Sequence, residues 1–141
     1  MKSKIYTILL FSLLFTIMSI PAFAATSKFD FTMKHRVVNG KTNGEYHTLS
    51  GGKRPTISGS MYQTGGTTNT GTNEIFVELV NKTSGNSFGS VSLGKPNKNG
   101  SKKSFSETFS KKTGGGTKYY LIFYRVESDG RTISGDGSIS G

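Results

Sequence analysis

The feature that most constrains the fold of this chain is the alternation of apolar and polar residues within short blocks. Ile75, Val77 and Leu79 occupy every second position of residues 74–81, and residues 28–38 repeat the same pattern. A period of two places the apolar side chains on one face of an extended strand. No block follows the 3.6-residue period of an amphipathic helix. The alternation therefore predicts strands, each with one buried and one solvated face.

Turn residues separate these blocks. Two Asn-Gly pairs, at 39–40 and 43–44, lie between residues 28–38 and 45–49. They predict a hairpin, because both residue types tolerate positive φ. Further turns divide the chain into about eight short strands at spacings of about 8–12 residues, a pattern typical of β-sandwiches and small barrels. We expect an all-β fold, an antiparallel β-sandwich or small barrel of about eight short strands.

Two segments are candidates for exposed edge strands. Residues 55–62 begin with Pro55 and contain Gly59, and both residue types weaken the ladder of a central strand. Residues 131–141 are rich in Gly and Ser. An exposed edge offers unpaired backbone N–H and C=O groups to another chain. These segments are therefore candidate sites of homo-oligomer formation.

The most apolar segment, residues 118–127, predicts a central strand. It is apolar at both sets of alternating positions, whereas a two-layer sandwich buries one face of each sheet. The second face is either covered by another layer or exposed as an interaction surface. Exposure would make such a surface of Tyr120, Ile122 and Tyr124.

The N-terminal segment has the three parts of a secretory signal peptide. Lys2 and Lys4 precede an apolar run over residues 5–20, and small residues follow before the expected cleavage point. We expect residues 1–24 to be removed. Residues 25–141 then form a single domain that is secreted and extracellular, associated with the cell wall in one interpretation.

Residues 25–141 are strongly basic and contain no cysteine. Sixteen Lys and Arg against eight Asp and Glu give them a formal net charge of +8. The absence of cysteine excludes a disulfide framework, a thiolate metal site and a cysteine nucleophile. No apolar run in these residues approaches the ~20 residues that a transmembrane helix needs.

Most of the net charge comes from residues 95–118, where seven lysines accompany one acid, Glu107. If residues 104–110 form a strand, the loops at 94–100 and 111–117 lie at its opposite ends, and the lysines follow one side of the molecule. A cationic stripe of this kind attracts polyanions. The candidate polyanion-binding residues are Lys95, Lys98, Lys102, Lys103, Lys111, Lys112 and Lys118.

A second interpretation of the same lysines requires no ligand. Charged loops keep a chain rich in Gly, Ser and Thr soluble, and lysines protect edge strands from pairing with other chains. Charge runs often do nothing more than this. The sequence leaves both interpretations open.

Catalytic chemistry has little support in the sequence. His35 and His47 are the only residues suited to acid–base catalysis at neutral pH, and the hairpin expected around residues 39–44 makes them diagonal neighbours. With Asp30 or Glu45 they could in principle bind a metal, but no metal-ligand motif is present. We interpret them as half-buried strand histidines. We expect no catalytic residues, no metal and no cofactor, and a small hydrolase using a histidine is the remaining enzymatic alternative.

These features favour a secreted, basic, non-catalytic β-sandwich protein that binds an anionic cell-surface polymer or membrane through its lysine stripe. The anionic partner would be a wall polymer such as teichoic acid, or an anionic membrane surface. One alternative is an antimicrobial or toxin-like protein that acts on membranes, and another is an assembly protein that pairs through β edges. Extracellular nucleic acid is a weaker candidate, because no aromatic and basic pattern for base stacking is evident. We expect no intracellular nucleic acid as a partner.

Overall fold

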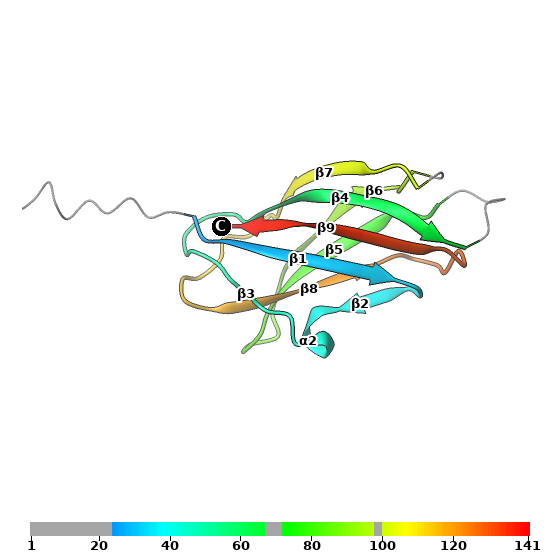
Figure 1. The fold of residues 1–141 in the computed structure, drawn as a ribbon. Coiled ribbons are helices and arrows are strands. Elements are labelled where there is room, and N and C mark those ends of the chain that lie inside the picture. The colour runs from blue at the N-terminus through cyan, green and yellow to red at the C-terminus, as the bar shows by residue number, and fades with distance from the viewer. Residues whose placement is uncertain (1–23, 67–71, 98–99) are drawn as a thin grey trace, which may run out of the picture.

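Two antiparallel sheets packed face to face form the protein (Figure 1). The computed structural model describes residues 24–66, 72–97 and 100–141. One sheet has the strand order β1-β9-β4-β7 and the other β2-β8-β5-β6, with β3 also paired to β8. The predicted β-sandwich is confirmed. The predicted signal segment lies, up to residue 23, outside the described residues.

The strands are short, and each sheet draws its members from distant parts of the chain. The first sheet consists of β1 (Thr26–Met33), β4 (Thr56–Gly65), β7 (Lys103–Thr108) and β9 (Thr132–Ser140). The second consists of β2 (Val37–Asn39), β3 (His47–Thr48), β5 (Ile75–Asn81), β6 (Ser87–Gly94) and β8 (Lys118–Tyr124). A four-residue helix, α2 (Gly40–Asn43), follows β2. In the described part of the chain, no helix has the length and apolar character needed to cross a membrane.

The core lies between the sheets and follows the predicted alternation. Ile75, Val77 and Leu79 of β5 are completely buried. Phe31 of β1 stacks on Phe123 of β8 with 4.1 Å between ring centroids, which joins the two layers. Burial of aromatic and aliphatic side chains of this kind is the main stabilising contribution in a chain without disulfides. The segment that contains β8 was predicted to be central, and β8 does lie between β2 and β5.

Glycines in β9 make room for the phenylalanines of β1. Phe29 is paired in register with Gly137, and Phe31 with Gly135. A Cβ atom on Gly137 would lie 2.9 Å from Cζ of Phe29 and 2.8 Å from Cα of Gly59 on β4. Real Cβ contacts are essentially never that short. The glycines therefore allow a close approach of strands that any side chain would prevent.

The predicted hairpin between residues 28–38 and 45–49 is wrong. β1 pairs with β9, whereas β2 and β3 both pair with β8. The Asn-Gly pairs instead begin and end α2. Asn39 Oδ1 accepts a hydrogen bond from the Lys41 N–H at 3.0 Å, and Gly44 closes the helix with a φ of 72°. Asn and Gly favour helix caps for the same local reasons that they favour hairpin turns.

The predicted strand over residues 28–38 is interrupted. β1 ends at Met33, residues 34–36 bend, and β2 joins the other sheet. The chain thus crosses from one layer to the other where the sequence suggested one continuous strand. The alternation continues through the bend, so periodicity alone does not reveal the crossing.

Both predicted edge strands are central. Residues 55–62 lie largely in β4, and residues 131–141 in β9, and these two strands pair with each other in the middle of their sheet. Pro55 precedes the first residue of β4, so its missing N–H interrupts no ladder, and its carbonyl accepts a bond from the Phe109 N–H at 2.9 Å. The described edges are those of β1 and β7 in one sheet and of β2, β3 and β6 in the other.

We expect Gly137→Ala to lower the free energy of unfolding by about 1–3 kcal/mol, the usual cost of overpacking a core. Urea denaturation followed by tyrosine fluorescence measures this change. Gly65→Ala is the matched control, because a Cβ there meets only ordinary contacts with Thr132 at 3.6 Å or more. Equal stability of the two variants would contradict the close approach of β4 and β9.

Candidate functional site

The structure divides the predicted lysine stripe into two groups at opposite ends of β7. Lys102 and Lys103 lie at the beginning of β7, and Lys95 follows β6. At the other end, Lys111 and Lys112 follow β7. The last two lysines are Lys118, which begins β8 at this second end, and Lys98, which lies outside the described residues.

The lysines at the beginning of β7 have acidic or packing partners. Lys102 forms an exposed ion pair with Asp136 at 3.7 Å. Lys103 is half-buried, and its Cε would lie 3.4 Å from a Cβ placed on Gly94 of β6. Lys95 lines a shallow pocket of about 240 Å³ together with Glu74 and other residues. Acidic side chains therefore offset part of the positive charge at this end.

At the other end of β7, the fold adds basic residues that are distant in the sequence. The Lys82 N–H donates to the Lys118 carbonyl at 2.9 Å, which joins the turn after β5 to the beginning of β8. The Thr113 N–H donates to the Lys53 carbonyl at 3.0 Å, which joins the loop before β4 to the loop after β7. We call the resulting group the basic end; its members are Lys53, Arg54, Lys82, Lys111, Lys112 and Lys118, and all six are exposed.

Thr113 holds two of these loops together. It is 4% exposed, and its Oγ1 donates to the Ser50 carbonyl at 2.8 Å. Its own carbonyl accepts a bond from the Gly52 N–H at 2.8 Å. A Cβ on Gly51 would lie 2.8 Å from Cα of Gly115, so the two backbones touch. This contact fixes the loop of Lys53 and Arg54 beside the loop of Lys111 and Lys112.

Two members of the basic end have partners that position their ammonium groups. Lys82 Nζ lies 4.2 Å from the centre of the Tyr46 ring, a cation–π contact. Lys111 Nζ donates to the Ser87 carbonyl at 3.0 Å. An ammonium group has three donors, so each of these lysines keeps hydrogen-bonding capacity for a ligand. Neither contact neutralises the charge.

Within residues 24–66, 72–97 and 100–141, the ion pairs are Lys102–Asp136 and Arg125–Asp129, and neither includes a member of the basic end. Glu107 on β7 is the one acidic residue of the lysine-rich segment 95–118. Cations gathered on one surface raise the local concentration of anionic partners. The basic end therefore has the electrostatic character of a polyanion site, whereas the beginning of β7 has it to a lesser degree.

Sequence reasoning missed Lys53, Arg54 and Lys82. The three residues lie outside the lysine-rich segment 95–118, and the two loops that carry them are almost 30 positions apart. The signal in the sequence that could have found them is the presence of basic residues in turns next to strands. Without the strand order, that signal does not say which turns share an end of the sandwich.

The predicted aromatic surface is largely covered. Tyr120 is buried, with its ring edge-on to Tyr46 at 6.4 Å between centroids. Tyr124 is half-buried, because it stacks on Phe76 at 5.5 Å and its hydroxyl lies 2.8 Å from Ser90 Oγ. Ile122 is also half-buried. An interaction surface at these residues stays a prediction, restricted to the parts that their neighbours leave open.

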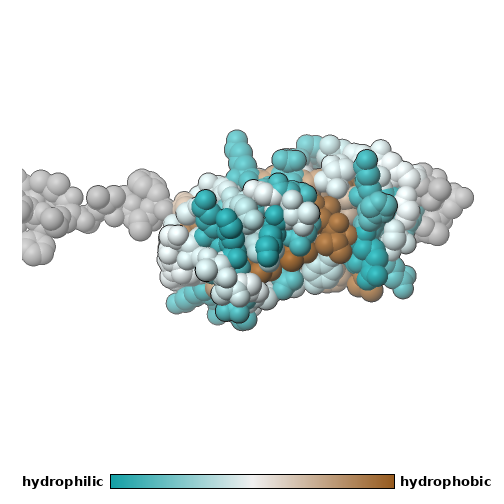
Figure 2. All heavy atoms as spheres, turned by 90° about the horizontal axis from the view of Figure 1, so that it is seen from below, coloured by the Kyte–Doolittle hydropathy of each residue, from teal (hydrophilic) through white to brown (hydrophobic). Residues whose placement is uncertain are grey.

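Among the residues that the structure describes, two large apolar side chains are exposed, and both are valines near that surface. Val37 of β2 is 53% exposed, and Val126, just after β8, is 65% exposed. Figure 2 shows hydrophobic surface between hydrophilic side chains when the molecule is seen from below. This surface is narrow and bordered by hydrophilic side chains, so it offers less to a partner than the basic end.

The two histidines are not neighbours. His35 is exposed in the bend between β1 and β2, whereas His47 is buried in β3. Their prediction as diagonal partners in one hairpin is wrong, because that hairpin does not form. Nδ1 of His47 lies 2.9 Å from Ser27 Oγ, and burial lowers the pKa of His47. His47 therefore favours the neutral form.

The two acids that could join the histidines in a metal site line a groove that contains neither histidine. Asp30 and Glu45 line a shallow groove together, and partial burial, followed by the charge of Asp30, raises the pKa of Glu45. In the part of the chain that the structure describes, no group of three or more His, Asp or Glu side chains could hold a metal ion.

The lowered pKa of His47 predicts a pH-dependent stability. Between that pKa and the ordinary value of 6.5, the unfolded chain binds more protons than the folded one, so the free energy of unfolding rises with pH. Above 6.5 this contribution is constant. Urea midpoints measured from pH 7 down to pH 5 should therefore fall on acidification. His47→Gln should weaken this fall, whereas the exposed-site control His35→Gln should preserve it; equal slopes for both variants would contradict the assignment.

Comparisons with known proteins supply no functional assignment. No family model matches the chain, and no curated protein matches it significantly. The function must therefore be inferred from the residues of the site.

Proposed function

We propose that this protein is a secreted, non-catalytic β-sandwich protein that binds an anionic polymer of the cell surface through the basic end. One observation carries the proposal: six exposed cations, from three loops and the beginning of β8, gather at one end of the sandwich. At this end β5 and β7 finish, and β4 and β8 begin (Figure 1). Thr113 and the contact of Gly51 with Gly115 hold part of this surface in place.

The residue types suit a charged polymer better than a small molecule. Five of the six are lysines, which act as flexible point charges and do not impose the planar geometry of a guanidinium. Neutralising a row of phosphates or carboxylates releases bound counterions, so affinity should fall steeply with salt. Teichoic acid in a Gram-positive wall has this chemistry, and secretion would bring the protein to it.

The structure divides the lysine stripe into two groups. This division favours the basic end as the binding surface over the full set of seven lysines. Asp136 offsets the charge of Lys102, and packing against β6 restricts the side chain of Lys103, so both are less suited to bind a polyanion. Lys111, Lys112 and Lys118 remain in the proposal, with Lys53, Arg54 and Lys82 added. Protection of the β7 edge is then the role of the lysines at its beginning.

The test compares two triple variants with equal loss of charge. Lys53→Gln/Lys112→Gln/Lys118→Gln changes the basic end, and Lys34→Gln/Lys95→Gln/Lys102→Gln changes exposed lysines elsewhere. Binding to purified cell walls that contain or lack teichoic acid is measured over a salt series. We expect the protein to bind the anionic walls and the basic-end variant to lose most of that binding. Its slope of log affinity against log salt should be shallower by about two units, at about 0.7 per contact.

Three outcomes would refute this function: binding that survives high salt, equal binding to both kinds of wall, or equal loss in the two triple variants. Vesicles of anionic lipid loaded with dye provide a further comparison. Leakage at micromolar protein, without binding to walls, would favour the membrane-active alternative instead.

A further inference from the structure

Two arginines are buried at the end of the sandwich opposite the basic end. Arg125 follows β8 and Arg131 precedes β9, and each residue is 1% exposed. A buried guanidinium is costly unless it is paired and hydrogen-bonded. The partners of each arginine therefore show how its charge is accommodated.

Arg125 has a partner at each of its three guanidinium nitrogens. Its Nε donates to the His35 carbonyl at 3.0 Å, and its Nη1 forms an ion pair with Asp129. Its Nη2 donates to the carbonyls of Lys34 at 3.4 Å and Arg131 at 2.9 Å. Each guanidinium nitrogen of Arg125 thus has a partner within the fold, and Asp129 balances its charge.

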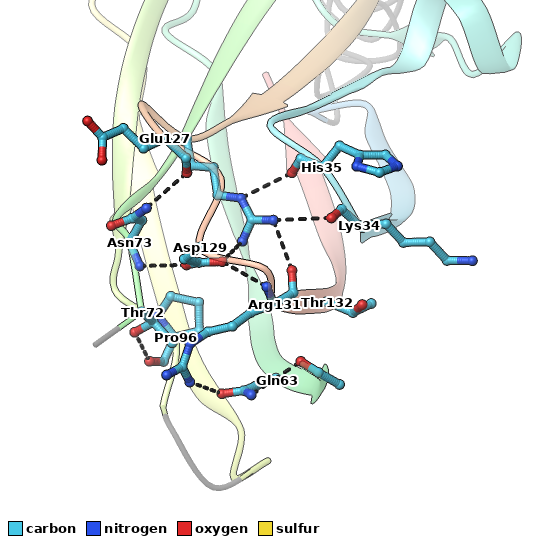
Figure 3. A network of polar contacts seen from close by, with 12 residues as sticks. Lys34, His35, Gln63, Thr72, Asn73, Pro96, Glu127, Asp129, Arg131 and Thr132 are labelled. Carbon is cyan, nitrogen blue, oxygen red and sulfur yellow. Dashed lines mark hydrogen bonds and ion pairs between the residues drawn. The ribbon is translucent and has the colours of Figure 1, made fainter. Parts of the chain in front are cut away.

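Arg131 is only partly satisfied. Its Nη1 donates to Gln63 Oε1 at 2.6 Å, a neutral acceptor. Its Nε and Nη2 are buried and have no hydrogen-bond partner. In Figure 3 its side chain points toward Gln63 and toward the contact between Thr72 and Pro96.

The chain contains no carboxylate that could serve Arg131. All eight Asp and Glu residues belong to the described ranges, so none is hidden in the other segments. Among the described residues, Asp129 pairs with Arg125, and no acid lies within ion-pair distance of the Arg131 guanidinium. Asp129 also accepts bonds from the backbone N–H groups of Asn73 and Arg131, both at 3.0 Å. The Asp129 carboxylate therefore pairs with the guanidinium of Arg125 and reaches Arg131 only through its backbone N–H.

The unpartnered nitrogens form one edge of the guanidinium plane. The N–H bonds of Nε and Nη2 are nearly parallel, and this edge matches two oxygens of a carboxylate or phosphate in a bidentate contact. We propose that the Nε–Nη2 edge of Arg131 is a binding site for a small oxyanion with carboxylate or phosphate chemistry. The enclosure of both nitrogens limits the ligand to a small ion and excludes a polymer, so this site is independent of the basic end.

The test follows the Arg131 Nε–H resonance of the purified protein by NMR, assigned through bonds from the backbone of Arg131. Sodium formate, inorganic phosphate or sodium chloride is added at constant ionic strength, balanced with a bulky buffer anion. We expect formate or phosphate to shift this resonance with saturation, and the shift to be absent from the resonance of Arg125. A response to formate alone assigns a carboxylate site, and a response to phosphate alone assigns a phosphate site. No response, or a response to chloride only, would overturn the proposal.

Thermal unfolding provides a second measurement. Saturating formate or phosphate should raise the Tm of the wild-type protein by about 5 °C at ten times the dissociation constant, because the ligand binds only the folded state. Arg131→Met removes the charge and the donors, and Arg131→Lys keeps the charge without the bidentate edge, so neither should gain from the anion. Arg36→Met, a change at an exposed arginine, should keep the wild-type response. Equal gains in Arg131→Met and the wild type would also overturn the proposal, and the NMR titration of the wild type decides it if both variants fail to fold.

Discussion

The architecture depends on the hydrogen bonds of Arg125. Its guanidinium binds the carbonyls of Lys34 and His35 in the bend where the chain leaves one sheet for the other, and also the turn that contains Asp129. One buried side chain thus ties the first crossing between the layers to the connection that leads into β9. Loss of this side chain would remove the hydrogen bonds to three carbonyls and leave Asp129 without its cationic partner, which costs more than the contacts contribute individually.

The proposed sites at the two ends of the sandwich differ in the exposure of their cationic side chains. At one end, Lys53, Lys112 and Lys118 are exposed, and hydrogen bonds of Thr113 hold two of the loops together. At the other, Arg125 and Arg131 are enclosed. Exposed ammonium groups remain hydrated and can exchange counterions for a polymer, whereas an enclosed guanidinium requires a matched acceptor. The two proposed sites therefore differ in ligand size as well as in location.

Local pattern predicted the strands well but their partners poorly. The alternation in residues 74–81 reports burial directly, because the period of two belongs to the strand itself. The Asn-Gly pairs at 39–40 and 43–44 predicted a hairpin and instead cap a helix, because Asn and Gly relieve the same backbone constraints in both structures. Pro55 predicts an edge strand by its residue type, yet it lies one residue before the ladder of β4 begins.

By itself, the sequence determined the all-β class, the approximate positions of most strands, the basic character of the chain and the lysine-rich segment around β7. Each of these depends on composition or on residues close together along the chain. The tertiary structure alone decided which strands are central, where the chain changes sheets, and which charges lie together. Lys53 and Lys82 join Lys112 and Lys118 because strand pairing brings distant turns to one end of the sandwich, and strand pairing depends on how whole faces pack.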